Sequence, residues 1–206
     1  MRNPNRQAER RRALDKDPER PDTLIIYNSK NGSTMEYANW MAQELSCDVM
    51  PFVKNRLGLI SVYQNIVYGG WMRASEIVGL NLVLNNYENF NMAGKNFYVF
   101  GVGLGDPEDE DYITKIRQFN YIEKLPRDHY FHLPGRYHRK DLHMSEKTML
   151  KAFGDKMFDG LTDDESCIIR TRMDEGYDGV DRKNIEPVVD EIRRLRETVI
   201  RTGMSR

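Results

Sequence analysis

The sequence predicts an α/β protein with a parallel sheet covered by helices on both faces. The first observation is that five short apolar segments alternate with segments of helical periodicity, which is typical of repeated βαβ units. The second is that residues 23–27 form a continuous apolar run, as expected of a strand buried on both faces. The third is a long apolar stripe near the C-terminus, at the spacing of a helix packed on a core.

The expected strands lie at residues 23–27, 47–53, 65–68, 96–100 and 129–133. Each is a short apolar run that ends in turn-forming residues, such as Gly69 and Gly70 after the third run and Pro134 and Gly135 after the fifth. Because helical segments separate the runs, we expect the strands to pair in parallel.

The expected helices lie at residues 33–45, 75–87, 111–122, 145–158 and 185–199. Each carries apolar side chains on one stripe, as a helix that packs on a core does. Ser33 and Glu36 stand at the spacing of a capping box, so the first helix is expected to begin at Ser33. The fourth helix belongs to a segment, 136–183, that the five βα units do not need and that continues as a polar stretch at 163–181.

Charge divides the chain near residue 22. Residues 1–20 hold seven basic and four acidic side chains, whereas the whole chain of 206 residues carries a net charge of −1. We therefore expect residues 1–22 to be a charged, disordered extension. Residues 23–203 are expected to form one domain, with 136–183 as an insertion. The basic run at 10–12 is interpreted as solvated, and no nucleic-acid partner is expected.

Composition excludes several classes of protein. No apolar run approaches the ~18 residues that cross a bilayer, and the first residues lack the apolar core of a secretory signal. Cys47 and Cys167 stand alone, which argues against a disulfide scaffold or a zinc module, and both are interpreted as small buried side chains. The four histidines lack metal-ligand spacing. This pattern predicts a cytoplasmic protein without a metal site.

Three predicted loops meet at the carboxyl edge of the sheet, where open α/β sheets bind ligands. They cover residues 28–34, 69–75 and 101–111. The first contains Ser29, Lys30, Asn31, Gly32, Ser33 and Thr34 and leads directly into a helix. Its hydroxyls, its glycine and the helix N-terminus suit an anion such as a phosphate, and the alternative is an ordinary capped turn.

The residues of these loops resemble those of the flavodoxin family. The strand at 24–27 and the loop at 29–34 resemble the [ST]-x-[ST]-G-x-T phosphate loop of flavodoxins, with Asn31 in place of one hydroxyl. Residues 69–71 are similar to the second loop, near the flavin ring, and residues 99–106 to the third loop, at the pyrimidine edge of the flavin. The resemblance spans residues 23–200 and implies a three-layer sandwich with strand order 2-1-3-4-5.

The resemblance also implies bound FMN. Besides residues 29–34, its candidate contacts are Gly69, Gly70, Trp71, Gly101, Gly103, Gly105 and Asp106. Trp71 is interpreted either as an aromatic neighbour of the flavin or as a packing residue, whereas Tyr112 stands farther from Asp106 than the stacking Tyr of carrier flavodoxins. The acidic residues at 108–111 either lower the potential of the flavin or start a helix. No catalytic residue is assigned.

Three functions are compatible with the sequence. The favoured one is electron transfer or oxidoreduction through FMN, with a reductase, a quinone or a small-molecule substrate as redox partner. Because the insertion that begins at Gly135 resembles that of menaquinone-dependent protoporphyrinogen oxidases, a second is such an oxidase with a quinone acceptor. Its candidate contacts to a membrane surface are Arg136, Arg139, Lys140 and the helix at 145–158. The third is a flavin-free interaction module.

Overall fold

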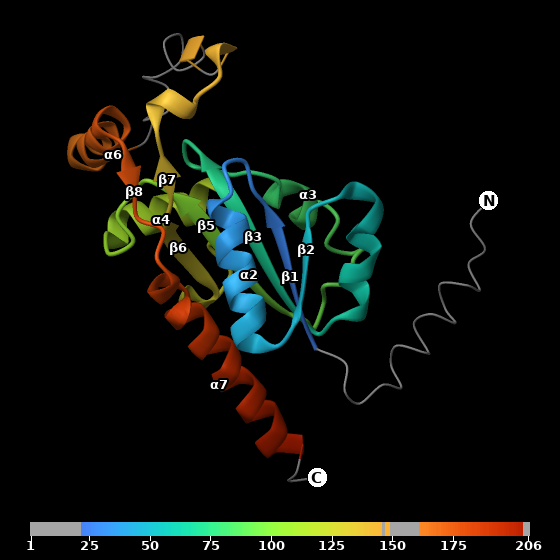
Figure 1. The fold of residues 1–206 in the computed structure, drawn as a ribbon. Helices are drawn as coiled ribbons and strands as arrows, with labels where there is room; N and C mark the ends of the chain where they lie inside the picture. The colour runs from blue at the N-terminus through green and yellow to red at the C-terminus, as the bar shows by residue number, and fades with distance from the viewer. Residues whose placement is uncertain (1–21, 146, 149–160, 204–206) are drawn as a thin grey trace.

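The computed structural model describes residues 22–145, 147–148 and 161–203 and contains a central parallel sheet (Figure 1). The strand order is β2-β1-β3-β5-β6, with a short strand, β4, paired to the end of β3. The parallel strands are β1 (Thr23–Asn28), β2 (Asp48–Pro51), β3 (Asn65–Arg73), β5 (Asn96–Gly103) and β6 (Tyr130–Pro134). Counted along the chain without β4, this order is the expected 2-1-3-4-5, so the predicted fold class is confirmed.

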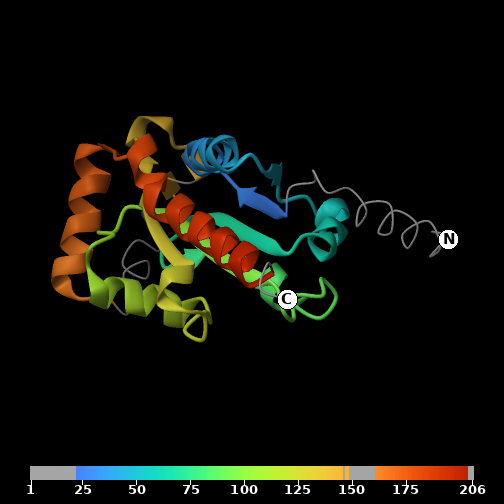
Figure 2. The ribbon, with the colours of Figure 1, turned by 90° about the horizontal axis from the view of Figure 1, so that it is seen from below.

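The core lies in two layers, one on each face of the sheet. On one face pack α2 (Ser33–Leu45) and α7 (Glu186–Gly203), which lie side by side (Figures 1 and 2). On the other pack η1 (Lys54–Val62), α3 (Leu80–Leu84) and α4 (Glu110–Phe119). Side chains that alternate along β1 contribute to both layers, since Leu24 and Ile26 face one layer and Ile25 faces the other. The continuous apolar run therefore marks a strand buried on both faces.

The third strand is longer than predicted, and only the middle of the helix predicted at 75–87 is present, as α3 (Leu80–Leu84). β3 continues to Arg73, the chain turns back as β4 (Glu76–Ile77), and α3 follows. Side chains bind the backbone of this segment: the Ile77 amide donates to Asn120 Oδ1 at 2.8 Å, and the Tyr68 hydroxyl donates to the Val78 carbonyl at 2.8 Å. Gly79, with φ of 89°, then marks the start of α3.

The insertion contains structure where the sequence indicated only a polar stretch. The helix α6 (Asp163–Glu175) is flanked by β7 (Arg136–Tyr137) and β8 (Tyr177–Asp178), which pair in antiparallel fashion beyond the edge of the main sheet (Figure 1). Most of the helix predicted at 145–158 lies outside the described residues, as does the extension at 1–21.

The remaining boundaries differ by a few residues from the predicted ones. Short 3-10 helices join some of the elements, among them η2 (Arg127–His129), η3 (Arg139–Asp141) and η5 (Arg182–Ile185). The expectation that both cysteines are buried is wrong for Cys167, which is exposed on α6; Cys47 is half-buried, and burial raises the pKa of its thiol to about 12. Among the described residues, no helix has the length and hydropathy to cross a membrane.

Candidate functional site

The first loop connects β1 to α2 at the carboxyl edge of the sheet. Gly32 precedes the helix with φ of 94°, a conformation that favours glycine, and its amide donates to Ser29 Oγ at 3.2 Å. The predicted capping box is absent, because Gly32 occupies the cap position and no side chain caps the helix. Ser33 instead lies inside the first turn. The first amides of α2 therefore lack the serine cap that the sequence indicated.

Ser33 and Thr34 are buried at the N-terminus of α2. Their exposed fractions are 6% and 1%, and Ser33 Oγ has no hydrogen-bond partner. Buried hydroxyls are normally paired, so an orphaned one beside the uncapped N–H groups of a helix indicates a place for a ligand acceptor. A phosphate supplies such acceptors, and the helix N-terminus favours its charge. The residues present thus fit the phosphate of the expected cofactor.

The carboxylate of Glu36 lies near this loop, and an arginine of the insertion pairs with it. A Cβ atom at Gly32 would lie 3.7 Å from Glu36 Oε1. Arg136 on β7 donates to that oxygen through Nη1 at 3.1 Å and to Asp178 Oδ2 through Nε at 2.7 Å. These bonds to Asp178 and Glu36 raise the pKa of Arg136 above its ordinary value. The ion pair reduces the repulsion that Glu36 exerts on an anion at the loop.

Gly69 and Gly70, predicted for the second loop, lie inside β3 rather than in a loop. They pair with Tyr27 and Asn28 of β1, and a Cβ atom at Gly69 would lie 2.0 Å from Cζ of Phe100. A Cβ atom at Gly70 would lie 2.5 Å from Ile77 Cγ2. Close packing of neighbouring side chains on the sheet therefore requires glycine at both positions.

Trp71 is the member of this group that reaches the first loop. Its side chain is half-buried, and Lys30 Nζ lies 5.0 Å from its ring centroid. Lys30 and Asn31 are themselves exposed. The structure thus brings the tip of the predicted phosphate loop and the predicted aromatic neighbour together.

The residues predicted for the third loop are divided between a strand and a loop. Gly101 and Gly103 lie in β5, and a Cβ atom at Gly103 would lie 2.9 Å from Met72 Sδ. Gly105 and Asp106 follow β5 at its carboxyl end. A Cβ atom at Gly105 would lie 2.2 Å from the ring of Tyr112, which is only 3% exposed.

The acidic run starts a helix. Asp109 caps α4 by accepting from the amides of Asp111 and Tyr112, both at 3.0 Å, and Glu110 and Asp111 lie in the first turn. The structural alternative for residues 108–111 is therefore confirmed. Their effect on a flavin potential stays a prediction.

The sequence interpretation missed two residues that contact the third loop. Arg172 on α6 donates through Nη1 to the carbonyls of Leu104 and Gly105, at 2.6 and 2.9 Å. His132 on β6 is buried against Tyr112, and burial, followed by the charge of Arg172, lowers the pKa of the imidazole to about 4. The spacing of Thr162 and Glu165, a capping box, was the available signal for α6.

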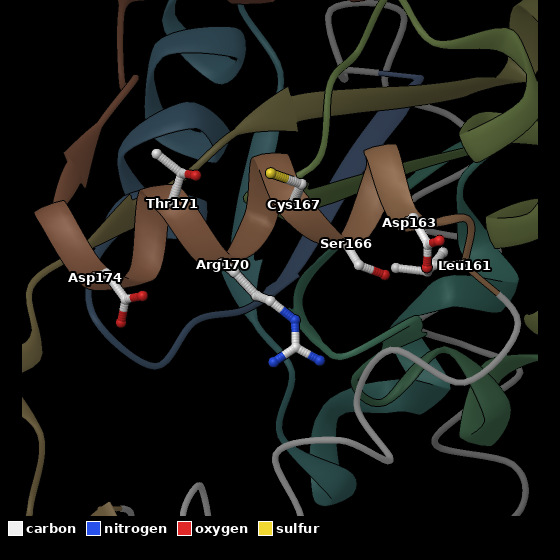
Figure 3. Close-up of a pocket in the computed structure, with 7 residues that line it drawn as sticks. All are labelled: Leu161, Asp163, Ser166, Cys167, Arg170, Thr171 and Asp174. Atoms are coloured by element: carbon white, nitrogen blue, oxygen red, sulfur yellow. The ribbon is translucent and has the colours of Figure 1, made fainter.

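A surface cavity lies elsewhere, on the outer side of α6. Its volume is about 400 Å³, and Figure 3 shows the side chains that line it. They are Leu161, Asp163, Ser166, Cys167, Arg170, Thr171 and Asp174. None of the predicted site residues contributes to this lining.

Within the described part of the chain, no group of three His, Cys, Asp or Glu side chains is arranged to hold a metal ion.

A comparison with protein families places most of the chain in a known family. The model described as "Flavodoxin domain" matches residues 24–164, which include all three predicted loops. A search of curated proteins finds no match.

Solved structures of similar fold include two flavodoxins from Bacillus cereus. Oxidised flavodoxin 2 has 20% identity and a TM-score of 0.37, over 65% of this chain and 98% of that chain. Oxidised flavodoxin 1 has 15% identity and a TM-score of 0.34, over 68% and 99%. The flavodiiron protein from Giardia intestinalis has 9% identity and a TM-score of 0.37, over 82% of this chain and 41% of that chain.

Proposed function

The chain belongs to the flavodoxin domain family, and from this membership we propose that it binds FMN and carries electrons through it. The observation that supports the proposal most directly is the buried, unpartnered Ser33 Oγ at the uncapped N-terminus of α2. A packed turn with no ligand has no reason to leave this hydroxyl unpaired, because an unsatisfied buried polar group costs about 1–3 kcal/mol. A bound phosphate removes that cost.

The protein's own residues bind and orient the cofactor in this proposal. Residues 29–34 hold the phosphate, and Trp71 and the loop at 104–106 border the ring. Gly69 and Gly70 contribute less than the sequence predicted, since both are paired within the sheet. FMN, when bound, supplies the one- and two-electron redox chemistry, and the protein supplies position and electrostatics.

The charges around this edge are mixed. Lys30 contacts Trp71, and Arg172 contacts the third loop, whereas Asp106 and Glu108 lie in the same loop region. A negative charge close to a flavin disfavours the anionic reduced form, and a positive charge favours it. The balance of these groups, rather than the acidic run alone, sets the potential.

The test is the absorption spectrum of the protein purified without added cofactor, and again after incubation with FMN and desalting. We expect the two visible-range bands of oxidised flavin to survive desalting. Gly32→Asp is expected to lose them, because it places a carboxylate against the phosphate. A wild-type protein that stays colourless after incubation overturns the proposal. A Gly32→Asp variant that retains flavin overturns the assignment of residues 29–34.

A flavin-free interaction module is the second candidate function. The observation in its favour is that the protein's own side chains, Phe100 and Ile77, fill the space over Gly69 and Gly70. The same spectrum separates this candidate from the first. Quinone-linked protoporphyrinogen oxidation stays a prediction of the sequence resemblance, because the helix on which its membrane contact depends lies largely outside the described residues. If FMN binds, turnover with a quinone distinguishes an oxidoreductase from an electron carrier.

A further inference from the structure

The helix α6 of the insertion is held against the third loop and α4. Lys115 on α4 pairs with Glu165 at 2.7 Å, and the Glu165 residue is 5% exposed. About two helical turns farther along, Arg172 reaches the third loop. Two separate polar contacts therefore fix the helix along its length. Such contacts are more specific than apolar packing, since buried donors and acceptors need defined partners.

Arg172 is itself fixed on two sides. Its Nη1 donates to the carbonyls of Leu104 and Gly105, and its guanidinium lies 4.4 Å from the ring centroid of Tyr177 on β8. A planar guanidinium that stacks on an aromatic ring is preorganised, so little side-chain freedom is lost in making the two hydrogen bonds. The contact holds two consecutive peptide groups of the third loop in one orientation.

That orientation determines where the loop's amides point. No cis peptide bond occurs in the described residues, and in a trans peptide the N–H points opposite to the C=O. The carbonyls of Leu104 and Gly105 point to Arg172. The amides of Gly105 and Asp106, which belong to the same two peptide groups, therefore point away from Arg172. Two adjacent N–H groups held in this way form a donor pair for ligand carbonyl oxygens.

We propose that Arg172 is a positioning residue that aims the amides of Gly105 and Asp106 at the carbonyl oxygens of the FMN pyrimidine ring. This inference rests on the proposed function and assigns the insertion a part in it. The Arg172 guanidinium also adds positive charge at the edge of the site where negative charge gathers when the flavin is reduced. This charge raises the reduction potential of the flavin. If Arg172 only stabilised α6, its removal would leave the reduction potential of the flavin unchanged.

Three variants test the proposal. Arg172→Met keeps the length and the apolar stem of the side chain but removes its hydrogen-bond donors. Arg172→Lys keeps the positive charge without the planar guanidinium. Arg170→Met is the matched control, because it removes an equal charge from the opposite side of α6. FMN dissociation constants are measured by quenching of flavin fluorescence, and reduction potentials by equilibration with a reference dye. Amide exchange at residues 104–106 is measured by NMR in FMN-free protein.

We expect Arg172→Met to weaken FMN binding at least 10-fold, to make the potential more negative, and to accelerate exchange at Gly105 and Asp106. Arg172→Lys should recover part of the affinity and the potential, and Arg170→Met should stay within 2-fold of wild type. If Arg172→Met is unfolded, the comparison of Arg172→Lys with wild type decides in the same way. The proposal is overturned if the Arg172 variants match wild type, or if Arg170→Met shows the same loss. Failure of the wild-type protein itself to bind FMN overturns the proposed function instead.

Discussion

Ser33 shows most clearly how a single residue links stability to function. Its hydroxyl is buried and unpartnered, while the amide of Gly32 is already satisfied by Ser29. In the ligand-free protein the hydroxyl therefore lowers stability, and in the proposed FMN complex it would donate to the phosphate. The proposal thus gives one atom opposite effects on the two states, which a side chain with a packing role alone would not have.

Ser33→Ala is accordingly expected to change stability and affinity in opposite directions. The ligand-free variant should unfold at higher urea concentration, with a free energy of unfolding about 1 kcal/mol above wild type, because an unsatisfied buried hydroxyl is removed. Its FMN dissociation constant should rise about 10-fold, the loss of one charge-assisted hydrogen bond. Urea denaturation and fluorescence titration measure the two quantities. Ser166→Ala on α6 is the control, and a Ser33→Ala variant that loses stability without FMN contradicts the interpretation.

The elements divide into those that local sequence specifies and those that tertiary contacts specify. The strands at 23–27 and 96–100 and the helix at 33–45 were predictable, because each buries a continuous or periodic apolar set. The segment at 75–87 was predicted only in part, because α3 (Leu80–Leu84) is helical while Glu76 and Ile77 form β4. Asn120, some 40 residues away, binds the backbone of Ile77 and Ser75 and holds them in a hairpin. Tertiary contacts of this kind override helix propensity when they satisfy the backbone hydrogen-bonding groups equally well.

The candidate site divides in the same way. The loop at 29–34 was predictable, because its hydroxyl, glycine and helix signals are contiguous in the sequence. Trp71 was singled out from the sequence, and the structure places Lys30 of the first loop against its ring. The contact of Arg172 was not predictable, because a lone arginine in a polar stretch carries no local signal and reaches the third loop only when α6 packs against residues 104–105. The glycines of β3 and β5 were predicted as cofactor contacts, which stays a prediction; the structure shows that neighbouring side chains leave no room for a Cβ atom at Gly69, Gly70 and Gly103.

The polar contacts that hold α6 begin at its first turn, and its N-cap is therefore a sensitive position. Thr162 Oγ1 accepts from the Glu165 amide, and the Glu165 side chain accepts from the Thr162 amide while pairing with Lys115. Thr162→Ala should cost the helix about 1 kcal/mol, the usual loss of an N-cap. We expect exchange of the α6 amides to accelerate about 5-fold, with the amides of β1, β3 and β5 unchanged. Hydrogen exchange followed by NMR measures both, and equal acceleration in the central strands would show that α6 unfolds only with the whole domain.

At the scale of the whole molecule, the insertion connects two of the three loops at the carboxyl edge. β7 contacts α2 through Arg136 and Glu36, and α6 contacts the third loop through Arg172. Tyr37 on α2 also donates to the carbonyl of Pro134, at the end of β6 just before the insertion. The family match ends at residue 164, within this segment, so the contact made by Arg172 lies outside the part shared with the family model. Ligand binding at the edge is thus expected to stabilise the sheet and the insertion together.

Thermal unfolding with FMN and with riboflavin tests this coupling and the part played by the phosphate. A ligand at about 100 times its dissociation constant adds about 2.7 kcal/mol of stability, which corresponds to a rise of about 5–10 °C in Tm for a domain of this size. Because the feature that best fits the cofactor is the phosphate loop, FMN should give this shift and riboflavin at the same concentration little of it. Gly32→Asp is the matched control and should lose the shift with FMN. Equal shifts from the two flavins would mean that the ring, held by Trp71 and residues 104–106, supplies the binding energy and that the N-terminus of α2 is an ordinary turn.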